Sequence, residues 1–304
     1  MRKTVRVLMA VAFLGTASLA AGCSEESHAS SSTGGYLVAL GDSYSVGYQP
    51  GKGTGPGFND YAAKQLGLTL ANFGCGGATT SSILNQVGCP AAARAKAGVQ
   101  VYDNETQVAA AVAFIKAHKN QVKLITVSIG GNDVTACAKD TNPIPCVSAA
   151  AGSIKTDVTS LASQLRSAAG SGTTMIGTTY PDVILGSWVY PSQPADQARK
   201  DLAALSVTAF KSLINPTLAS AYESAQGELV DVTQGTGAYG PMTDTTDVPT
   251  FGTLPTPVAR VCQLTWFCTK GDIHADDAGY TLIGQMVTAA AKAKAGSDAG
   301  GEEE

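Results

Sequence analysis

Apolar, β-branched runs alternate with longer stretches of helical character along this chain. Residues 36–40, 68–73, 124–129, 175–179 and 229–232 have the length and composition of strands. Residues 58–66, 105–119, 154–169, 195–224 and 277–294 are long enough for helices, with Pro216 expected to break or kink the fourth. Strands joined by helical crossovers pair in parallel, and helices cover both faces of the resulting sheet. The pattern therefore predicts an α/β fold of three layers, α/β/α, with a central parallel sheet.

Composition and charge narrow the range of partners. The chain of 304 residues is 44% hydrophobic and 14% charged, which is ample for a buried core. Its formal net charge of -4 and pI near 5.4 come with no Lys/Arg cluster outside the extreme N-terminus. We therefore expect no nucleic-acid partner.

The N-terminus is typical of a secretion signal. A basic start, MRKTVR, precedes an apolar stretch over residues 7–21 that is short for a membrane span. The stretch ends in Leu19-Ala20-Ala21-Gly22-Cys23, which resembles a bacterial lipobox with Ala20 where leucine is most common. We predict a signal peptide of the lipoprotein type over residues 1–22, lipidation of Cys23, and export, with the protein anchored on the outer face of the cell membrane or secreted. The alternative is ordinary signal cleavage nearby.

Segments that cannot bury a core flank the predicted domain. Residues 23–35 are rich in Ser with Gly and Glu, so we expect a flexible tether. Residues 295–304 are small, contain Gly and close with three glutamates, so we expect a disordered acidic tail. The remaining residues, 36–294, would form one domain.

Seven cysteines in an exported chain leave one over when six are paired, and Cys23 is the natural odd one. The other six come in couples that are close in sequence. From roughly 15 possible connectivities we choose Cys75–Cys89, Cys137–Cys146 and Cys262–Cys268. Each disulfide would staple a local loop in an oxidising compartment. A metal site is the competing interpretation, but the chain has no CxxC or HxxxH spacing, so we predict no metal and no cofactor.

Two segments resist the strand and helix pattern, residues 134–149 and 234–270. Both contain prolines or glycines, and each carries one predicted cysteine pair. We interpret them as long, stapled surface loops. Because loops of this length are commonly functional, and these lie next to the chemical blocks described below, we expect them to shape the mouth of a substrate site.

Candidate chemistry begins with the block Gly41-Asp42-Ser43-Tyr44. It follows an apolar strand, so the Ser43 hydroxyl would emerge at the edge of the sheet. The alternative is a serine at a helix start, where Ser is a favoured cap. The surrounding GDSYS lacks the second glycine of the GxSxG turn of α/β-hydrolases, which disfavours that family.

Two further blocks, NFGCGGAT at residues 72–79 and GGND at residues 130–133, also follow predicted strands. Glycines let backbone N–H groups approach an anion closely, and an amide side chain such as that of Asn132 can hold a developing oxyanion. Taken alone, the first block could be a tight turn, and Asn132 could cap one.

A base must come from three histidines. His28 lies in the predicted tether, and His118 lies at a polar helix end, where a cation suits the helix dipole. His274 remains, in GDIHAD just before the last predicted helix. The alternative for His274 is a polar residue that merely flanks the helix.

The GDS block, the NxxxxGAT-like block, GGND and a late histidine, in this order, resemble the SGNH hydrolases of the GDSL esterase/lipase family, particularly secreted actinobacterial members. The resemblance covers residues 36–294 and implies a flavodoxin-like fold. It also implies Ser43 as nucleophile, the Gly77 amide and Asn132 as oxyanion donors, and His274 as base. Tyr180-Pro181 and three local disulfides resemble those members as well.

One departure from the family concerns the group that orients His274. The family usually has an aspartate three residues before the histidine, where this chain has Gly271, and Asp272 is one position late. Some members use a main-chain carbonyl instead. We prefer a Ser/His dyad with the Gly271 carbonyl on the ring, because in an extended segment Asp272 would not obviously reach the far ring nitrogen. A triad through Asp272 is the alternative. A second departure, Gly76 where serine is common, would soften the loop without removing the Gly77 amide.

The resemblance implies a serine esterase or lipase that hydrolyses carboxylic esters through an acyl-enzyme on Ser43. A carbohydrate O-deacetylase with the same residues, and a non-catalytic surface binding lipoprotein, are the alternatives. We expect an ester of a lipid or small molecule as substrate, contact with the membrane through the lipid anchor, and a monomer. Five aromatic residues could line the pocket or simply be half-buried, namely Tyr44, Tyr48, Trp188, Tyr190 and Trp266.

Overall fold

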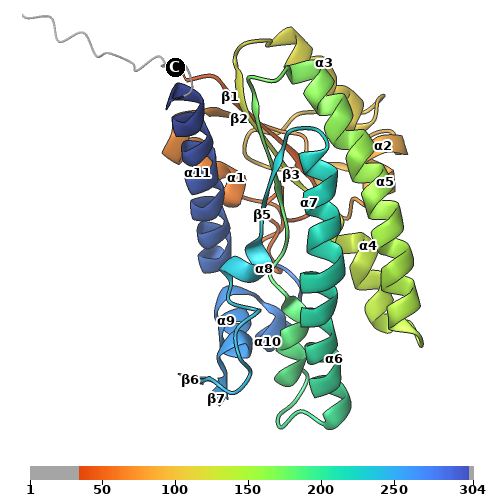
Figure 1. Cartoon of the computed structure of the whole chain (residues 1–304), viewed down its shortest axis with the longest axis vertical. Helices are drawn as coiled ribbons and strands as arrows, with labels where there is room; N and C mark the ends of the chain where they lie inside the picture. Colours follow the sequence, from red (N-terminus) through yellow and green to blue (C-terminus); the bar gives the residue numbers. More distant parts are fainter. Residues whose placement is uncertain (1–33, 301–304) are drawn as a thin grey trace, which may run out of the picture. The chain divides into compact units, whose positions relative to one another are not determined.

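A five-stranded parallel sheet lies at the centre of the fold (Figure 1). Its strand order is β2-β1-β3-β4-β5. The computed structural model describes residues 34–300, so the predicted signal peptide, Cys23 and nearly all of the tether lie outside the described residues. The strands are β1 (Tyr36–Gly41), β2 (Thr69–Asn72), β3 (Val122–Ser128), β4 (Thr174–Thr178) and β5 (Glu228–Val230). All the predicted strands are present, and this strand order is that of flavodoxin-like folds. The predicted α/β class is confirmed.

The carboxyl ends of the three central strands lie side by side. Gly41 of β1 is in register with Ser128 of β3, and Ser128 is in register with Thr178 of β4. In open parallel sheets, the residues that follow the carboxyl ends of neighbouring strands face a common crevice. The segments after Gly41, Ser128 and Thr178 therefore meet at one edge of the sheet.

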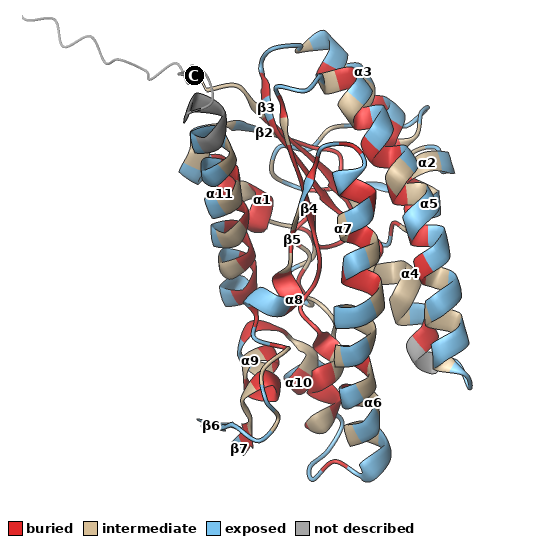
Figure 2. Ribbon diagram, viewed as in Figure 1, coloured by how far each residue is buried: buried red, intermediate tan, exposed pale blue. Residues whose placement is uncertain are grey.

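Helices cover both faces of the sheet and turn their apolar sides toward it (Figure 2). One face packs against α1 (Phe58–Leu66) and α11 (Asp277–Gly300), and the other against α3 (Gln107–Ala117), α5 (Pro143–Ala169) and α7 (Asn215–Glu223). Leu37 and Ala39 point to the first layer, whereas Val38 and Leu40 point to the second. This alternation along β1 is expected of a strand that is buried on both faces.

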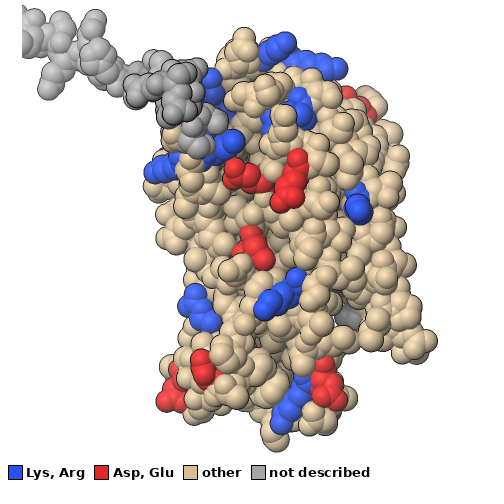
Figure 3. All heavy atoms as spheres, viewed as in Figure 1, with Lys and Arg blue, Asp and Glu red and all other residues tan. Residues whose placement is uncertain are grey.

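Shorter elements complete the described chain. The remaining helices are α2 (Thr80–Asn85), α4 (Gly131–Thr135), α6 (Gln197–Ala209), α8 (Val232–Gly235), α9 (Thr256–Leu264) and α10 (Phe267–Lys270). β6 (Thr245–Val248) and β7 (Gly252–Pro255) form a separate antiparallel pair. Single 3₁₀ segments lie at Ala91–Ala93, Ala136–Lys139 and Val183–Trp188. On the surface that Figure 3 shows, basic and acidic side chains are scattered among uncharged ones.

The helix predicted over residues 195–224 contains a π-turn, Phe210–Ile214, between α6 and α7. Pro216 lies in the first turn of α7. A proline has no N–H for the helical ladder, and its ring would collide with the carbonyl four residues earlier. The wider π-turn just before Pro216 accommodates the ring, so the chain stays helical rather than breaking there.

The prediction that two long segments are surface loops is wrong, because both contain regular secondary structure. Residues 134–149 contain the end of α4, a 3₁₀ segment and the start of α5, and residues 234–270 contain β6, β7, α9 and α10. In both segments prolines lie in the first turn of a helix, Pro143 in α5 and Pro257 in α9. Proline is favourable there because its missing N–H would have no helical partner anyway.

The last helix, α11, continues to Gly300, beyond the predicted end at residue 294. The predicted disordered tail therefore overlaps the helix, whose last part is rich in alanine, a strong helix former. Residues 301–304 lie outside the described residues. The three predicted disulfides, Cys75–Cys89, Cys137–Cys146 and Cys262–Cys268, are all present.

Candidate active site

Ser43 lies on a rigid turn directly after β1. Gly41 has a φ of 131°, and a Cβ at this position would overlap the Ser128 carbonyl oxygen, so the turn requires glycine. The Asp42 amide donates to that same oxygen at 3.0 Å, and the Tyr44 amide donates to the Asp42 carboxylate at 2.9 Å. Ser43 lines an apolar pocket.

The Asp42 carboxyl group is buried beneath this turn. Tyr180 donates its hydroxyl to Asp42 Oδ2 at 2.6 Å. Burial raises the pKa of Asp42 to about 7, and the hydrogen bond from Tyr180 lowers it in part. The sequence does not predict this pair. Asp42 follows β1 and Tyr180 follows β4, and nothing in the sequence indicates that the two side chains are in contact.

Gly77 lies in a braced loop after β2. The Cys75 amide donates to the Gly41 carbonyl oxygen at 2.9 Å, and the Gly76 amide donates to the Ala93 carbonyl oxygen at 2.6 Å. Gly77 has a φ of 83°, which favours glycine. Within residues 34–300, neither the Ser43 N–H nor the Gly77 N–H has a hydrogen-bond acceptor. Both amides are therefore free to bind an anion.

Asn132 is the second residue of α4, which follows β3 after a short turn, and its side chain reaches the loop that carries Gly77. Asn132 Nδ2 donates to the Ala78 carbonyl oxygen at 2.7 Å, which leaves its second N–H available. Asp133 ties the same two segments, because it accepts hydrogen bonds from the Thr80 amide and hydroxyl. The second and third sequence blocks are thus bound to each other.

His274 lies between α10 and α11, and its ring is held by Asp272. The distance between His274 Nδ1 and Asp272 Oδ1 is 2.7 Å. The same carboxylate oxygen accepts the His274 backbone N–H at 3.0 Å. The preference for the Gly271 carbonyl is therefore wrong. Gly271 caps α10 with a φ of 65°, and the Asp272 carboxylate then accepts the backbone N–H two residues later, a local turn that keeps this carboxylate next to the His274 ring.

The other ring nitrogen, His274 Nε2, is buried and has no hydrogen-bond partner within the described residues. Tyr48 packs on the ring with centroids 4.5 Å apart, and the Tyr44 hydroxyl donates to the Ile273 carbonyl oxygen at 2.6 Å. The residues that follow Ser43 therefore hold the His274 segment directly. Burial lowers the pKa of His274, and the Asp272 carboxylate partly offsets this effect. A neutral imidazole, the form that can accept a proton, is favoured.

The apolar pocket lined by Ser43 contains about 980 Å³ of empty space, a volume that includes open solvent. Tyr44, Asn132 and Ile273 line it next to Ser43. Its apolar walls come from α4, α5, the Val183–Trp188 segment, α6, the π-turn and α7, represented by Val134, Val147, Ile184, Leu205, Phe210 and Leu218. Sequence reasoning missed these residues, because an apolar stripe at helical spacing is also what a helix buried in the core would show.

The other expected residues lie outside this pocket. Gly77 lines a separate cavity, and His274 is not on the lining of the apolar pocket. Of the five aromatic residues, Tyr44 lines the pocket and Tyr48 packs on His274, whereas Trp188, Tyr190 and Trp266 do not line it. Of the two segments expected to shape the mouth, residues 234–270 contribute nothing to the lining, and residues 134–149 contribute Val134, Thr135, Cys137, Pro143 and Val147. Across residues 34–300, no group of three or more His, Cys, Asp or Glu side chains could hold a metal ion.

The site holds a serine, two backbone amides without acceptors among the described residues, an asparagine amide and a His–Asp pair. These groups lie by the carboxyl edge of a flavodoxin-like sheet, an arrangement typical of hydrolases of the SGNH type. Residues 37–287 match the family model described as GDSL-like Lipase/Acylhydrolase. The chain therefore belongs to the GDSL-like lipase/acylhydrolase family, a family of ester hydrolases.

Solved structures and curated proteins give these comparisons. A protein assigned to the G-D-S-L lipolytic family from Desulfitobacterium hafniense DCB-2 is 12% identical, with 84% of this chain and 98% of that chain covered and a TM-score of 0.41. A protein from Lactobacillus plantarum is 13% identical, with 85% and 97% covered and a TM-score of 0.41. A carbohydrate esterase is 15% identical, with 65% and 58% covered and a TM-score of 0.33. No curated protein matches the chain.

Proposed function

We propose that this protein is a serine esterase that hydrolyses carboxylic esters with an apolar acyl group. One observation carries the proposal: Ser43 and Asn132 both line the same apolar pocket. An ester whose carbonyl carbon is placed at Ser43 would direct its acyl chain into that pocket, where burial of each methylene contributes about 0.8 kcal/mol.

In the proposed reaction, His274 Nε2 takes the proton of the Ser43 hydroxyl as the oxygen attacks the ester carbonyl carbon. The resulting oxyanion would be held by the Ser43 and Gly77 amides and by the second N–H of Asn132 Nδ2. His274 then returns the proton to the departing alcohol, and water releases the acyl group from Ser43. The neutral state of Nε2 and its lack of a partner among the described residues support the role of His274 as base.

Asp272 would complete a triad. Its carboxylate lies 2.7 Å from Nδ1 and so fixes the tautomer in which Nε2 carries the lone pair. During attack, the imidazole becomes an imidazolium, and the adjacent negative charge would stabilise it. This contact supports the triad over the dyad preferred from the sequence.

Two other functions use or retain the same residues. A carbohydrate O-deacetylase would need room for only two acyl carbons, so the extended apolar walls favour a longer acyl chain instead. A non-catalytic binding lipoprotein would need no hydrogen-bonded His–Asp pair in this region.

A panel of 4-nitrophenyl esters from acetate to long acyl chains, together with acetylated glycans, tests the proposal. We expect kcat/KM to rise from acetate to medium-length acyl chains, and Ser43→Ala to abolish turnover. A fluorophosphonate should label the wild-type protein at Ser43. Preference for acetylated glycans would replace the proposal with deacetylation, and absence of both labelling and turnover would leave the binding function.

For localisation, we propose an exported protein tethered through a lipid on Cys23 and acting as a monomer. Three disulfides are compatible with an oxidising compartment. Mass spectrometry of the mature N-terminus should find Cys23 at the first position with added acyl mass, and an unmodified Cys23 would contradict the anchor.

A further inference from the structure

Three parts of the candidate site meet at Gly41, the last residue of β1. Its carbonyl oxygen accepts a hydrogen bond from the Cys75 amide at 2.9 Å, two residues before Gly77. The next amide along, that of Asp42, donates at 3.0 Å to the carbonyl oxygen of Ser128, four residues before Asn132. Ser43 itself is two residues after Gly41. The position of Gly41 therefore influences the spacing of all these groups.

One side chain, that of Gln107, binds both polar atoms of the Gly41 backbone. Its Oε1 accepts from the Gly41 amide at 2.7 Å, and its Nε2 donates to the Gly41 carbonyl oxygen at 3.2 Å. Gln107 is the first residue of α3, distant in sequence from Gly41, and is only 3% exposed. A primary amide is suited to this double contact, because it offers one acceptor and one donor in a single plane.

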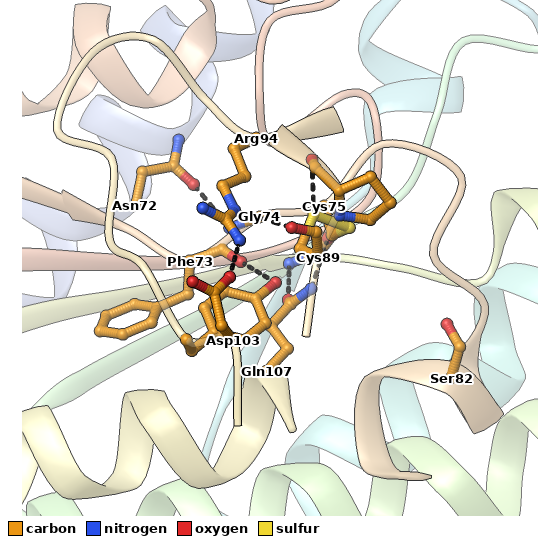
Figure 4. The surroundings of a disulfide bond; sticks show 12 residues. Asn72, Phe73, Gly74, Cys75, Ser82, Cys89, Arg94, Asp103 and Gln107 are labelled. Atoms are coloured by element: carbon orange, nitrogen blue, oxygen red, sulfur yellow. Dashed lines mark hydrogen bonds and ion pairs between the residues drawn. A yellow bond between two sulfur atoms is a disulfide. The ribbon is translucent and has the colours of Figure 1, made fainter. Parts of the chain in front are cut away.

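The surroundings of Gln107 are themselves fixed (Figure 4). The Cys75–Cys89 disulfide joins the loop that carries Gly77 to the segment leading to α3. Arg94, ion-paired with Asp103, donates through Nε to the Cys89 carbonyl oxygen at 2.7 Å. Gln107 therefore links β1 to a part of the molecule that cannot easily shift with it.

We propose that Gln107 is a positioning residue for ester hydrolysis, which holds Gly41 so that Ser43 and the Gly77 amide keep the separation that the oxyanion requires. The inference rests on the proposed function. Displacement of a reacting group by about 1 Å can cost roughly a hundredfold in rate. A helix residue with no contact to the substrate would thus control kcat.

Two variants separate positioning from folding. Gln107→Leu removes both hydrogen bonds at similar volume, and kcat should fall roughly ten- to a hundredfold with KM within about twofold. Gln107→Glu keeps the shape. When protonated, the introduced carboxyl group can accept from the Gly41 N–H and donate to the Gly41 oxygen; when ionised, it has no proton to donate and repels that oxygen. The ratio of variant to wild-type kcat should therefore be near one at low pH and fall as pH rises.

Other titrating groups near this position do not produce that change in the ratio. Tyr102 has a pKa raised to about 12 by burial and stays neutral over the assay range. Arg94 and Asp103 are ion-paired. Asp42, with a pKa raised to about 7 by burial, titrates in both proteins, and any further rise of its pKa in Gln107→Glu comes from the ionised carboxylate introduced at position 107 and is absent in Gln107→Leu. The matched control is Gln164→Glu on α5, an exposed glutamine bonded to Ser160, which should leave kcat unchanged at every pH.

The positioning role of Gln107 is tested by measuring turnover of 4-nitrophenyl esters from pH 5 to 9, with circular dichroism at each pH to monitor folding. A ratio for Gln107→Glu that falls with pH while the fold is retained supports positioning, even if Gln107→Leu does not fold. Wild-type kcat in the variants, or a loss that follows unfolding alone, overturns it. Failure of the proposed function looks different, because the wild-type protein itself would then neither turn over esters nor react with a fluorophosphonate.

Discussion

Replacing Asp272 by asparagine tests the orientation of His274. The introduced side-chain amide retains an oxygen that can accept both the His274 amide and Nδ1–H, so the geometry should survive while the charge is lost. The contact between Asp272 Oδ1 and His274 Nδ1 is 2.7 Å long, and the two side chains are 25% and 12% exposed. Two opposite charges 4 Å apart interact by about 1 kcal/mol in water and about 4 kcal/mol near a protein surface. For this partly exposed pair we expect about 2 to 3 kcal/mol, a loss of roughly 30- to 150-fold in kcat.

The assay is hydrolysis of a chromogenic ester across pH. Burial lowers the pKa of His274 and Asp272 raises it again in part, so removal of the carboxylate should lower the pKa further. Because neutral His274 is the active form, the acid limb of kcat/KM should move to lower pH in Asp272→Asn. A change of geometry alone would not move it.

Two reference variants frame the Asp272→Asn result. His274→Ala should be inactive, and Asp277→Asn, whose exposed carboxylate binds Lys52 and Gln49 in the wild-type protein, should leave the rate unchanged. If Asp272→Asn keeps a near-normal rate and an unmoved acid limb while His274→Ala is dead, the triad is refuted and a main-chain carbonyl orients the ring.

Three further measurements follow from the geometry. Asn132→Ala should lose roughly 3 kcal/mol of transition-state stabilisation, seen as a fall in kcat on a chromogenic ester; full activity would remove Asn132 from the oxyanion site. Leu205→Trp should fill part of the apolar pocket and displace about two to three methylenes of a long acyl chain. At about 0.8 kcal/mol for each methylene, kcat/KM for long acyl esters should fall roughly ten- to sixtyfold, with acetate unaffected. Ala204→Trp on the exposed side of α6 is the control, and an unchanged chain-length profile would argue against an acyl pocket. Burial raises the pKa of Asp182 to about 7, so the folded state binds its proton more tightly than the unfolded state and this contribution to stability is present at low pH and lost as pH rises through 7. Between the ordinary aspartate pKa and pH 7, the free energy of unfolding measured with urea should therefore fall less steeply with pH in Asp182→Asn than in the wild-type protein, by up to about 1.4 kcal/mol per pH unit. The same pH dependence in both proteins would contradict the raised pKa of Asp182.

The strands and most long helices could be predicted, because a parallel sheet buried on both faces needs apolar runs that little else in the chain imitates. The helices in residues 134–149 and 234–270 could not, because Pro143 and Pro257 look like breakers until their place in a first helical turn is known. The contact of Asp272 with His274 depends on the turn after Gly271, and spacing along the sequence does not specify that turn. The apolar pocket was missed because its walls come from helices that are far apart in sequence.

The π-turn at Phe210–Ile214 determines which residues of its helix face the pocket. In an uninterrupted α-helix, the face of Leu202, Leu205 and Ala209 would continue at residues 213 and 217, but the lining continues at Ile214 and Leu218, each one residue later. Loss of one residue here would rotate one half of the wall by about 100° relative to the other. The number of residues in this helix, as much as their identity, therefore specifies the shape of the pocket, and a single deletion offers a way to reshape it that no side-chain substitution provides.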